Sequence, residues 1–346
     1  MKKTIIYVLC LIILAGITTG LSACNQQDVL RIYNWGEYID ESILRDFTKE
    51  TGIRISYSTY ASNEEMYAKQ KGGGTQYDLI IPTDYMVERM IKEDMLEKIN
   101  FDNIPNFSNI DARFTNRAYD PNSEYSVPYT WGTNGIIYNT KMVDEEIVSW
   151  DVLWDSKYKG QIIMYDSMRD SFIPALIKLG YSINTRSIDE LTQARDLLLA
   201  QKPLVHAYMG DIMRDSMISG ESAIGLMFSG DAVYCIGENP DLSYVVPKEG
   251  SNVWFDAAVI PKGAKNKDKA EAFINFLCKP DIALKNTEYI GFSTVNAETY
   301  KMLPEELLEN PAYWATDEII GRCEILLDLG DFAREYDKAW TMVLAK

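Results

Sequence analysis

The stretch Val29-Leu30-Arg31-Ile32-Tyr33-Asn34-Trp35-Gly36-Glu37-Tyr38-Ile39-Asp40 sets the fold that we expect for this chain. Apolar and polar side chains alternate at its start, which predicts a strand, and a helix is expected to follow its last residue. Tight strand-to-helix junctions are where open α/β folds bind ligands. This junction carries Trp35, Glu37 and Tyr38, and a carboxylate flanked by rings suits an organic ammonium ion. A half-buried strand end with a surface acid explains the same residues equally well.

The amino terminus carries the pattern of a secretory signal peptide over residues 1–23. Two lysines precede an apolar run, and the segment leads into Leu21-Ser22-Ala23-Cys24, which resembles a bacterial lipobox. We therefore expect cleavage before Cys24, lipidation of its thiol, and a tether over residues 24–28. An uncleaved membrane anchor is the alternative. In both cases we expect the rest of the chain outside the cytoplasmic membrane, in the periplasm or at the cell surface, and bound to the membrane.

The charge balance narrows the class of partner. The chain has 34 basic and 51 acidic residues, which gives a net charge of −17. Such a field repels nucleic acid and favours cationic partners, although acidic surfaces also serve solubility alone. The cysteines and the single histidine, His206, show no metal-binding pattern. We expect no nucleic-acid partner, no metal ion and no cofactor.

Alternating strand and helix patterns predict an α/β protein of two domains. Strands are expected near residues 29–35, 53–60, 77–82, 161–165, 222–228 and 242–247, and helices near 40–49, 62–71, 87–95, 191–200, 266–277 and beyond 304. Asp40, Ser62 and Ser187 are the predicted helix caps. The extended pieces 125–139 and 253–261 are predicted to cross between domains, and 289–294 to form a loop. The expected domains are 29–133 with 258–302, and 134–257 with 303–346.

Several predicted strands end in short segments that mix aromatic rings with acids. These are Trp35-Gly36-Glu37-Tyr38, Thr83-Asp84-Tyr85, Ser167 with Asp170, Phe228 with Asp231, and Trp254-Phe255-Asp256. Basic residues are nearly absent from them, and Arg169 is the exception. Buried carboxylates need partners, and a cationic ligand is the simplest partner still missing. One such acid alone is more often a cap or a surface charge, but five together favour a pocket.

Longer motifs carry a resemblance to a known family. They are Tyr33-Asn34-Trp35-x-Glu37-Tyr38, Phe47-Thr48-Lys49-Glu50-Thr51-Gly52, Tyr77-Asp78-Leu79-x-x-Pro82, Tyr125-Ser126-Val127-Pro128-Tyr129-x-Trp131-Gly132, Lys157-Tyr158-Lys159-Gly160, Trp254-Phe255-Asp256 and Ile274-Asn275-Phe276-Leu277. In these, and across essentially the whole mature chain, the sequence resembles the bacterial polyamine-binding proteins of ABC importers, of the spermidine- and putrescine-binding type.

The resemblance implies a type II periplasmic-binding-protein fold, with two crossover strands and a ligand cleft that closes by hinge motion. Its acids would hold the amines and its rings would enclose the methylene chain. The residues implied are Trp35, Glu37, Tyr38, Thr83, Tyr85, Asp170, Phe228, Asp231, Trp254, Asp256 and Phe292. The expected protein is a monomer that delivers its ligand to ABC permease subunits and is not an enzyme.

The choice of polyamine depends on where this chain departs from its relatives. Spermidine-preferring relatives have an acid at Ser167, a tryptophan at Phe228, a tyrosine at Phe292, and a glutamine near Leu326, where Glu324 could substitute. Conversely, the segment 229–231 resembles the putrescine-binding branch, in which its acid holds an amine. The resemblance thus slightly favours putrescine or mixed specificity.

Two other readings remain open from the sequence. The same fold could bind another small ligand; a sugar is chemically possible, whereas ferric iron and anions need side chains that these strand ends lack. A secreted glycosidase with a carboxylate pair is the second, since such pairs cannot be recognised from spacing alone.

Overall fold

The computed structural model describes residues 29–73, 76–210 and 212–345. The expected signal peptide, Cys24 and the tether lie outside these residues. Strands are β1 (Val29–Trp35), β2 (Arg54–Tyr60), β3 (Leu79–Ile80), β4 (Ser126–Asn139), β5 (Ile162–Tyr165), β6 (Val205–Met209), β7 (Ile224–Phe228), β8 (Leu242–Val245), β9 (Val253–Val259) and β10 (Ser293–Thr294). In the described ranges, no helix is both long enough and apolar enough to cross a membrane.

The helices alternate with these strands along most of the chain. They are α2 (Glu41–Thr51), α3 (Asn63–Lys71), α4 (Asp84–Lys92), α5 (Met168–Lys178), α6 (Ile188–Gln201), α7 (Met213–Ile218), α8 (Ser229–Glu238), α9 (Lys267–Leu277), α10 (Pro280–Ile290), α11 (Ala297–Tyr300), α12 (Glu305–Glu309), α13 (Asp317–Gly321) and α14 (Ala333–Ala345), with short 3₁₀ turns between them. The predicted caps are confirmed: Asp40 accepts from the backbone N–H of Ser42, and Ser62 and Ser187 cap α3 and α6.

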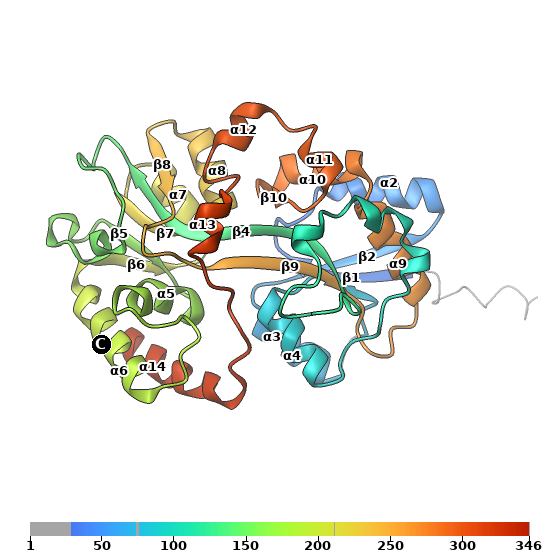
Figure 1. Cartoon of the computed structure of the whole chain (residues 1–346), viewed down its shortest axis with the longest axis horizontal. Coiled ribbons are helices and arrows are strands. Elements are labelled where there is room, and N and C mark those ends of the chain that lie inside the picture. Colours follow the sequence, from blue (N-terminus) through green and yellow to red (C-terminus); the bar gives the residue numbers. More distant parts are fainter. Residues whose placement is uncertain (1–28, 74–75, 211, 346) are drawn as a thin grey trace, which may run out of the picture.

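One sheet connects two lobes. Its strand order is β2-β1-β3-β9-β4-β7-β5-β6, and β8 and β10 also pair with β4. β1 runs parallel to β2 and β3, whereas the long pair β4 and β9 is antiparallel. Figure 1 shows this pair running between a lobe around β1 and a lobe around β5, which we call the first and second lobe. The predicted crossings at 125–139 and 253–261 are therefore confirmed.

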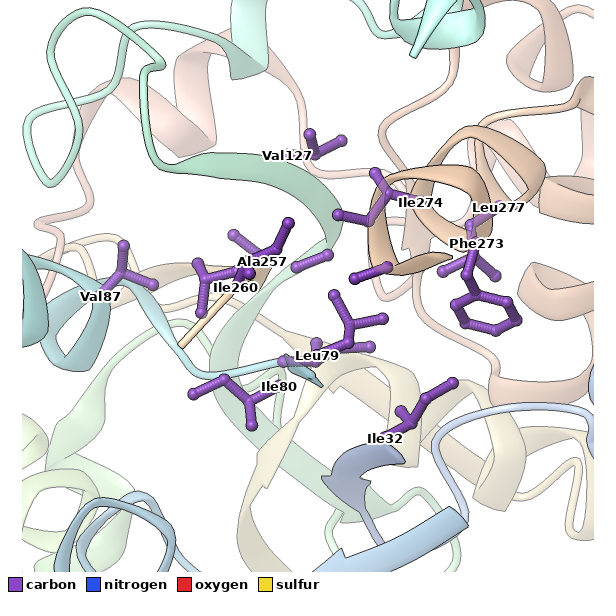
Figure 2. Close-up of a cluster of buried hydrophobic side chains, with 14 of the residues drawn as sticks. Ile32, Leu79, Ile80, Val87, Val127, Ala257, Ile260, Phe273, Ile274 and Leu277 are labelled. Atoms are coloured by element: carbon purple, nitrogen blue, oxygen red, sulfur yellow. The ribbon is translucent and has the colours of Figure 1, made fainter. Parts of the chain in front are cut away.

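Each lobe has its own apolar core. In the first, Ile32 of β1 and Leu79 of β3 pack with Phe273 and other side chains of α9 (Figure 2). Leu30 of β1 belongs to the same core. The second core gathers around β5 and β7, and a satellite core joins α5, α6 and α14. β9 contributes Phe255 to the first-lobe core.

A third segment, residues 323–329, also connects the lobes (Figure 1). The guanidinium of Arg169 donates to the backbone oxygen of Leu327, and that of Arg186 to the oxygen of Asp328, which ties the segment to the second lobe. On the other side, the backbone N–H of Asp328 donates to Oε2 of Glu88 on α4 at 3.0 Å. The segment therefore contacts both lobes outside the sheet.

Some predicted elements differ from the structure. The buried parallel strand expected over 77–82 is present as β3, parallel to β1, but is only two residues long, and α4 begins soon after it at Asp84. The loop expected over 289–294 is reduced to residues 291–292, because α10 continues to Ile290 and β10 begins at Ser293. Pro280 begins the unpredicted helix α10, since a proline that ends one helix can also occupy the first position of the next. Helices α5, α7, α8, α10 and α11 and the strand β6 were not predicted.

Candidate ligand-binding site

The crossover pair β4 and β9 presents one face to the region between the lobes. In its register Thr130 lies opposite Asp256, and Gly132 opposite Trp254. Because side chains alternate along a strand, Trp254 and Asp256 share a face, while Phe255 between them enters the first-lobe core. Gly132 has a steric role here, since a Cβ atom at this position would lie 2.5 Å from Cζ2 of Trp254. The indole can therefore lie directly against β4.

Aromatic rings gather on this face. The centroid of Phe292 lies 5.2 Å from Trp254 and 5.5 Å from Tyr38, and that of Phe228 lies 6.0 Å from Trp254. Trp35 packs against the same group, and its Nε1–H donates to the backbone oxygen of Ile81. These rings come from both lobes and from β9. We call Tyr38, Phe228, Trp254, Asp256 and Phe292 the site cluster.

Asp256 is the buried acid of this cluster and is only 4% exposed. Its Oδ2 accepts a hydrogen bond from the Tyr38 hydroxyl at 2.5 Å, whereas its Oδ1 is buried without any partner. Thr83 forms a backbone bridge with Asp256, which brings the start of α4 to the same place. Burial raises the pKa of Asp256 to about 6, and the Tyr38 and Thr83 hydroxyls offset part of that effect. A cation with N–H donors would satisfy Oδ1.

Asp170 stands in the first turn of α5, in the second lobe. Ser167 caps this helix and donates from its hydroxyl to Oδ2 of Asp170 at 2.5 Å. The side-chain amide of Asn134, on β4, donates to Oδ1 of Asp170 at 2.9 Å. Burial raises the pKa of Asp170, and these two hydrogen bonds oppose the shift. Asn134 lies opposite Phe228 in the β4–β7 register, so Asp170 is linked to the site cluster.

Three predicted site residues have other partners. Glu37 is exposed, has a φ of 50°, and accepts from the hydroxyl of Tyr289 on α10 at 2.9 Å. The Tyr85 hydroxyl contacts Asn63 and Glu64. Asp231 lies in the first turn of α8 and forms an ion pair with Arg214 at 2.8 Å, with the Tyr165 hydroxyl at its other oxygen.

Within the strand-end segments Arg169 is the one basic residue, as the sequence shows, but the fold brings a second one, Arg214, to the acid Asp231. Arg214 lies on α7, a short helix that the sequence pattern did not reveal, and its partner Asp231 is more than a dozen residues away. Arg169 instead extends to the backbone of Leu327 and to the Asn184 side chain. Asp256 and Asp170 are instead hydrogen-bonded by neutral groups, the Tyr38 hydroxyl for the first and the Asn134 amide and Ser167 hydroxyl for the second.

Three further residues near the site were not among the predicted site residues, although Asp84 was noted as one of the strand-end acids. Tyr129 donates from its hydroxyl to the backbone oxygen of Tyr38 and fixes that turn. Asp84, which is fully buried, accepts from the backbone N–H of Phe255 and so holds β9 against α4. Asn134 is the third. Counting in steps of two along 125–139 would have placed Asn134 on the same face as Gly132, which is the available signal.

Comparison with known proteins gives the family. Residues 42–315 match the family described as bacterial extracellular solute-binding protein. The chain belongs to this family. A spermidine/putrescine-binding periplasmic protein from Salmonella typhimurium is 38% identical over 334 residues, which cover 95% of this chain and 96% of that protein.

Solved structures of solute-binding proteins agree. A putative spermidine/putrescine ABC transporter protein from Listeria monocytogenes has a TM-score of 0.88 at 39% identity, and covers 92% of this chain and 99% of its own. The spermidine/putrescine ABC transporter substrate-binding protein from Streptococcus pneumoniae has a TM-score of 0.82 at 42% identity, with the same coverage. The predicted resemblance and the two-domain fold are confirmed.

The same relatives confirm the prediction that this chain is a transport protein and not an enzyme. They are substrate-binding proteins of transporters and not enzymes, so the glycosidase alternative is set aside. The family is extracellular, which agrees with the predicted location outside the cytoplasmic membrane.

Proposed function

We propose that this protein captures polyamines, putrescine and/or spermidine, outside the cytoplasmic membrane and delivers them to the permease subunits of an ABC importer. In this proposal it is a monomer, anchored through a lipid on Cys24. Its two domains are 29–133 with 258–302, and 134–257 with 303–346, and the ligand binds between them.

The observation that carries the proposal is the unpartnered oxygen of Asp256. A buried carboxylate with one oxygen unsatisfied is unfavourable on its own. An ammonium group provides both the charge and the N–H donor that are missing. The rings of Tyr38, Trp254 and Phe292 surround this acid, and they supply apolar surface for methylene groups and cation–ring contacts.

Asp170 is the proposed partner of the second ammonium group of the ligand. Asp170 belongs to the second lobe and Asp256 to the return crossing, so a diamine could bridge them. Each charge-assisted hydrogen bond contributes about 1.5–3 kcal/mol net, and each cation–ring contact roughly 0.5–2 kcal/mol. A ligand with both contacts at each of its two ammonium groups would have a binding free energy of about −8 kcal/mol, which corresponds to micromolar affinity.

The remaining proposed contacts differ in how they could serve a ligand. Glu37 is exposed and accepts from Tyr289 through Oε2, which leaves acceptor sites of its carboxylate for an amine. Asp231 is already paired with Arg214, which weakens the argument for putrescine drawn from this residue. Leu326 is buried beside Ile173 and Ile183, and the carboxylate of Glu324 accepts from Ser182 and the backbone of Ile183. Neither supplies an amine contact where it lies.

The test is calorimetric titration of the ligand-free protein from residue 25 onward with putrescine and with spermidine. Saturable one-to-one binding supports the proposal, and the tighter ligand identifies the preference. No heat with either polyamine, together with binding of a sugar, would support the same fold serving a different ligand. Labelling with radioactive palmitate, compared between the wild type and Cys24→Ser, tests the lipid anchor.

A further inference from the structure

Asn134 occupies a fixed position where the crossover strand enters the second lobe. Its side chain is completely buried. Its backbone N–H donates to the oxygen of Asn252, and its backbone oxygen accepts from the Ser251 hydroxyl at 2.6 Å. In the β4–β7 ladder it lies directly opposite Phe228 of the site cluster. Directly opposed residues of an antiparallel pair place their side chains next to each other on one face.

The orientation of the Asn134 amide follows from chemistry. An ionised carboxylate only accepts hydrogen bonds, so the amide must turn its Nδ2 toward Oδ1 of Asp170, at 2.9 Å. Its own Oδ1 then points away from that oxygen, and it is buried without a partner. Most buried polar side-chain atoms in proteins are hydrogen-bonded, and an unpaired carbonyl oxygen in a fully enclosed position is unfavourable.

We propose that Asn134 is a ligand-binding residue, whose Oδ1 accepts a hydrogen bond from the ammonium group that pairs with Asp170. This inference rests on the proposed polyamine function and adds a residue to its second-lobe end. An ammonium group has three N–H donors and no acceptor, so it can satisfy the carboxylate and the neighbouring carbonyl together. The same amide thus holds Asp170 with its nitrogen and the ligand with its oxygen.

Because Oδ1 of Asn134 is an uncharged acceptor, it affects which ammonium groups the site can bind. An amide oxygen adds a hydrogen bond without adding a second negative charge, so this end of the site carries the single charge of Asp170. A primary ammonium with several N–H donors fits both acceptors. A quaternary ammonium of the same charge carries no N–H donor and cannot use Asn134.

The competing explanation is that Asn134 only positions Asp170. Ser167 provides the matched control, because its hydroxyl donates to the other oxygen of the same carboxylate. A double-mutant cycle between Asn134→Ala and Asp170→Asn separates the two roles. If Asn134 only positions the carboxylate, its removal has no further effect once the charge of Asp170 is gone.

The experiment measures putrescine affinity by calorimetry for the full chain and for the variants Asn134→Ala, Asp170→Asn, Ser167→Ala and the double variant. We expect Asn134→Ala to weaken binding about tenfold or more, more than Ser167→Ala does, and to keep weakening it in the Asp170→Asn background. Equal effects of Asn134→Ala and Ser167→Ala, with no further loss in the double variant, would overturn the inference.

The experiment also separates a failure of the proposed function from a failure of the variant to fold. If wild type binds neither putrescine nor spermidine, the proposed function itself fails, and this inference fails with it. If Asn134→Ala does not fold, as judged by circular dichroism, the unsubstituted protein is titrated and the ¹³Cγ signal of Asn134 is followed by NMR. A carbonyl that gains a charged donor is deshielded, so a downfield shift supports the inference and an unchanged signal overturns it.

Discussion

Burial of the Asp256 carboxylate acts in opposite directions on folding and on ligand binding. Without ligand, its charge is enclosed by rings and one oxygen is unsatisfied. With an ammonium group present, the same enclosure strengthens the ion pair, because the surrounding dielectric is low. A residue of this kind lowers the stability of the empty protein and contributes to affinity.

The first prediction concerns stability. The pKa of Asp256 is about 6 in the folded protein against 3.8 for an unperturbed group. Between these values the folded state binds more protons than the unfolded state, so this group makes the free energy of unfolding fall as pH rises from about 4 to about 6. Urea unfolding should therefore show Asp256→Asn gaining stability relative to wild type between pH 4 and pH 7.5, by up to about 3 kcal/mol. A constant difference between the two proteins at both pH values would contradict this.

The second prediction concerns affinity. A protonated Asp256 cannot pair with an ammonium group, so putrescine binding should weaken as pH falls below about 6, approaching tenfold for each pH unit. Calorimetry from pH 5 to pH 8 measures this. The Asp256→Asn variant should bind about tenfold or more weakly at pH 7.5 and show a flatter pH profile. An equally steep profile in the variant would assign the titration to another acid.

At the scale of elements, the antiparallel pair β4 and β9 determines which side chains meet. Alternation along β9 brings Trp254 and Asp256 to one face, and the register with β4 places Gly132 opposite Trp254, which leaves room for the indole. The strand ends of the two lobes then add rings from either side. The site therefore depends on backbone geometry in the crossing as much as on the residues that would contact a ligand.

The third prediction tests that geometry. In Gly132→Ala the added methyl group would lie 2.5 Å from Cζ2 of Trp254 and 2.7 Å from Oγ of Ser229, so the indole must move. We expect a loss of about 1–3 kcal/mol in the free energy of unfolding and putrescine affinity reduced at least about tenfold, measured by urea unfolding and calorimetry.

Gly237→Ala is the matched control for this substitution. Gly237 lies on α8, is exposed, and has no atom close to a built Cβ. Alanine there should leave affinity unchanged and raise stability by roughly 0.5–1 kcal/mol, because glycine is a poor helix residue. Equal affinity in Gly132→Ala and wild type would mean that Trp254 does not contact the ligand.

Most elements could be predicted from local patterns, and the remainder required tertiary information. Periodicity and caps sufficed for α2, α3, α6 and the two crossings. The strand expected at 77–82 was predicted too long, because an apolar run shows burial but not where pairing stops. For the site, the rings and acids were recognisable by type. The Arg214–Asp231 ion pair was not, since it joins α7 to α8 through a contact that no sequence spacing encodes.

At the scale of the whole molecule, segment 323–329 contacts both lobes beside the crossover pair. Its backbone is tied to Arg169 and Arg186 of the second lobe, while Asp328 contacts Glu88 and Lys92 on α4 of the first. Contacts of this kind contribute to the balance between open and closed arrangements of the lobes.

The fourth prediction addresses that balance. Glu88→Ala removes the acceptor for the Asp328 N–H and should shift the ligand-free protein toward more open arrangements. Small-angle X-ray scattering should show a larger radius of gyration, and putrescine affinity should fall roughly threefold to tenfold. Glu93→Ala is the control, because Glu93 pairs with Lys71 and Arg89 within the first lobe. If both variants scatter alike, the contact with Glu88 does not affect lobe closure.

The first-lobe core is assembled from both halves of the chain. Phe47 lies 5.0 Å from Phe273 and 5.4 Å from Phe276, ring centre to ring centre, and more than two hundred residues separate them in sequence. A nascent chain leaving the ribosome therefore cannot complete this core until most of its length has been synthesised, and contacts of such long range form slowly. For a protein of an extracellular family, this delay would favour passage through any membrane channel that admits only an unfolded chain.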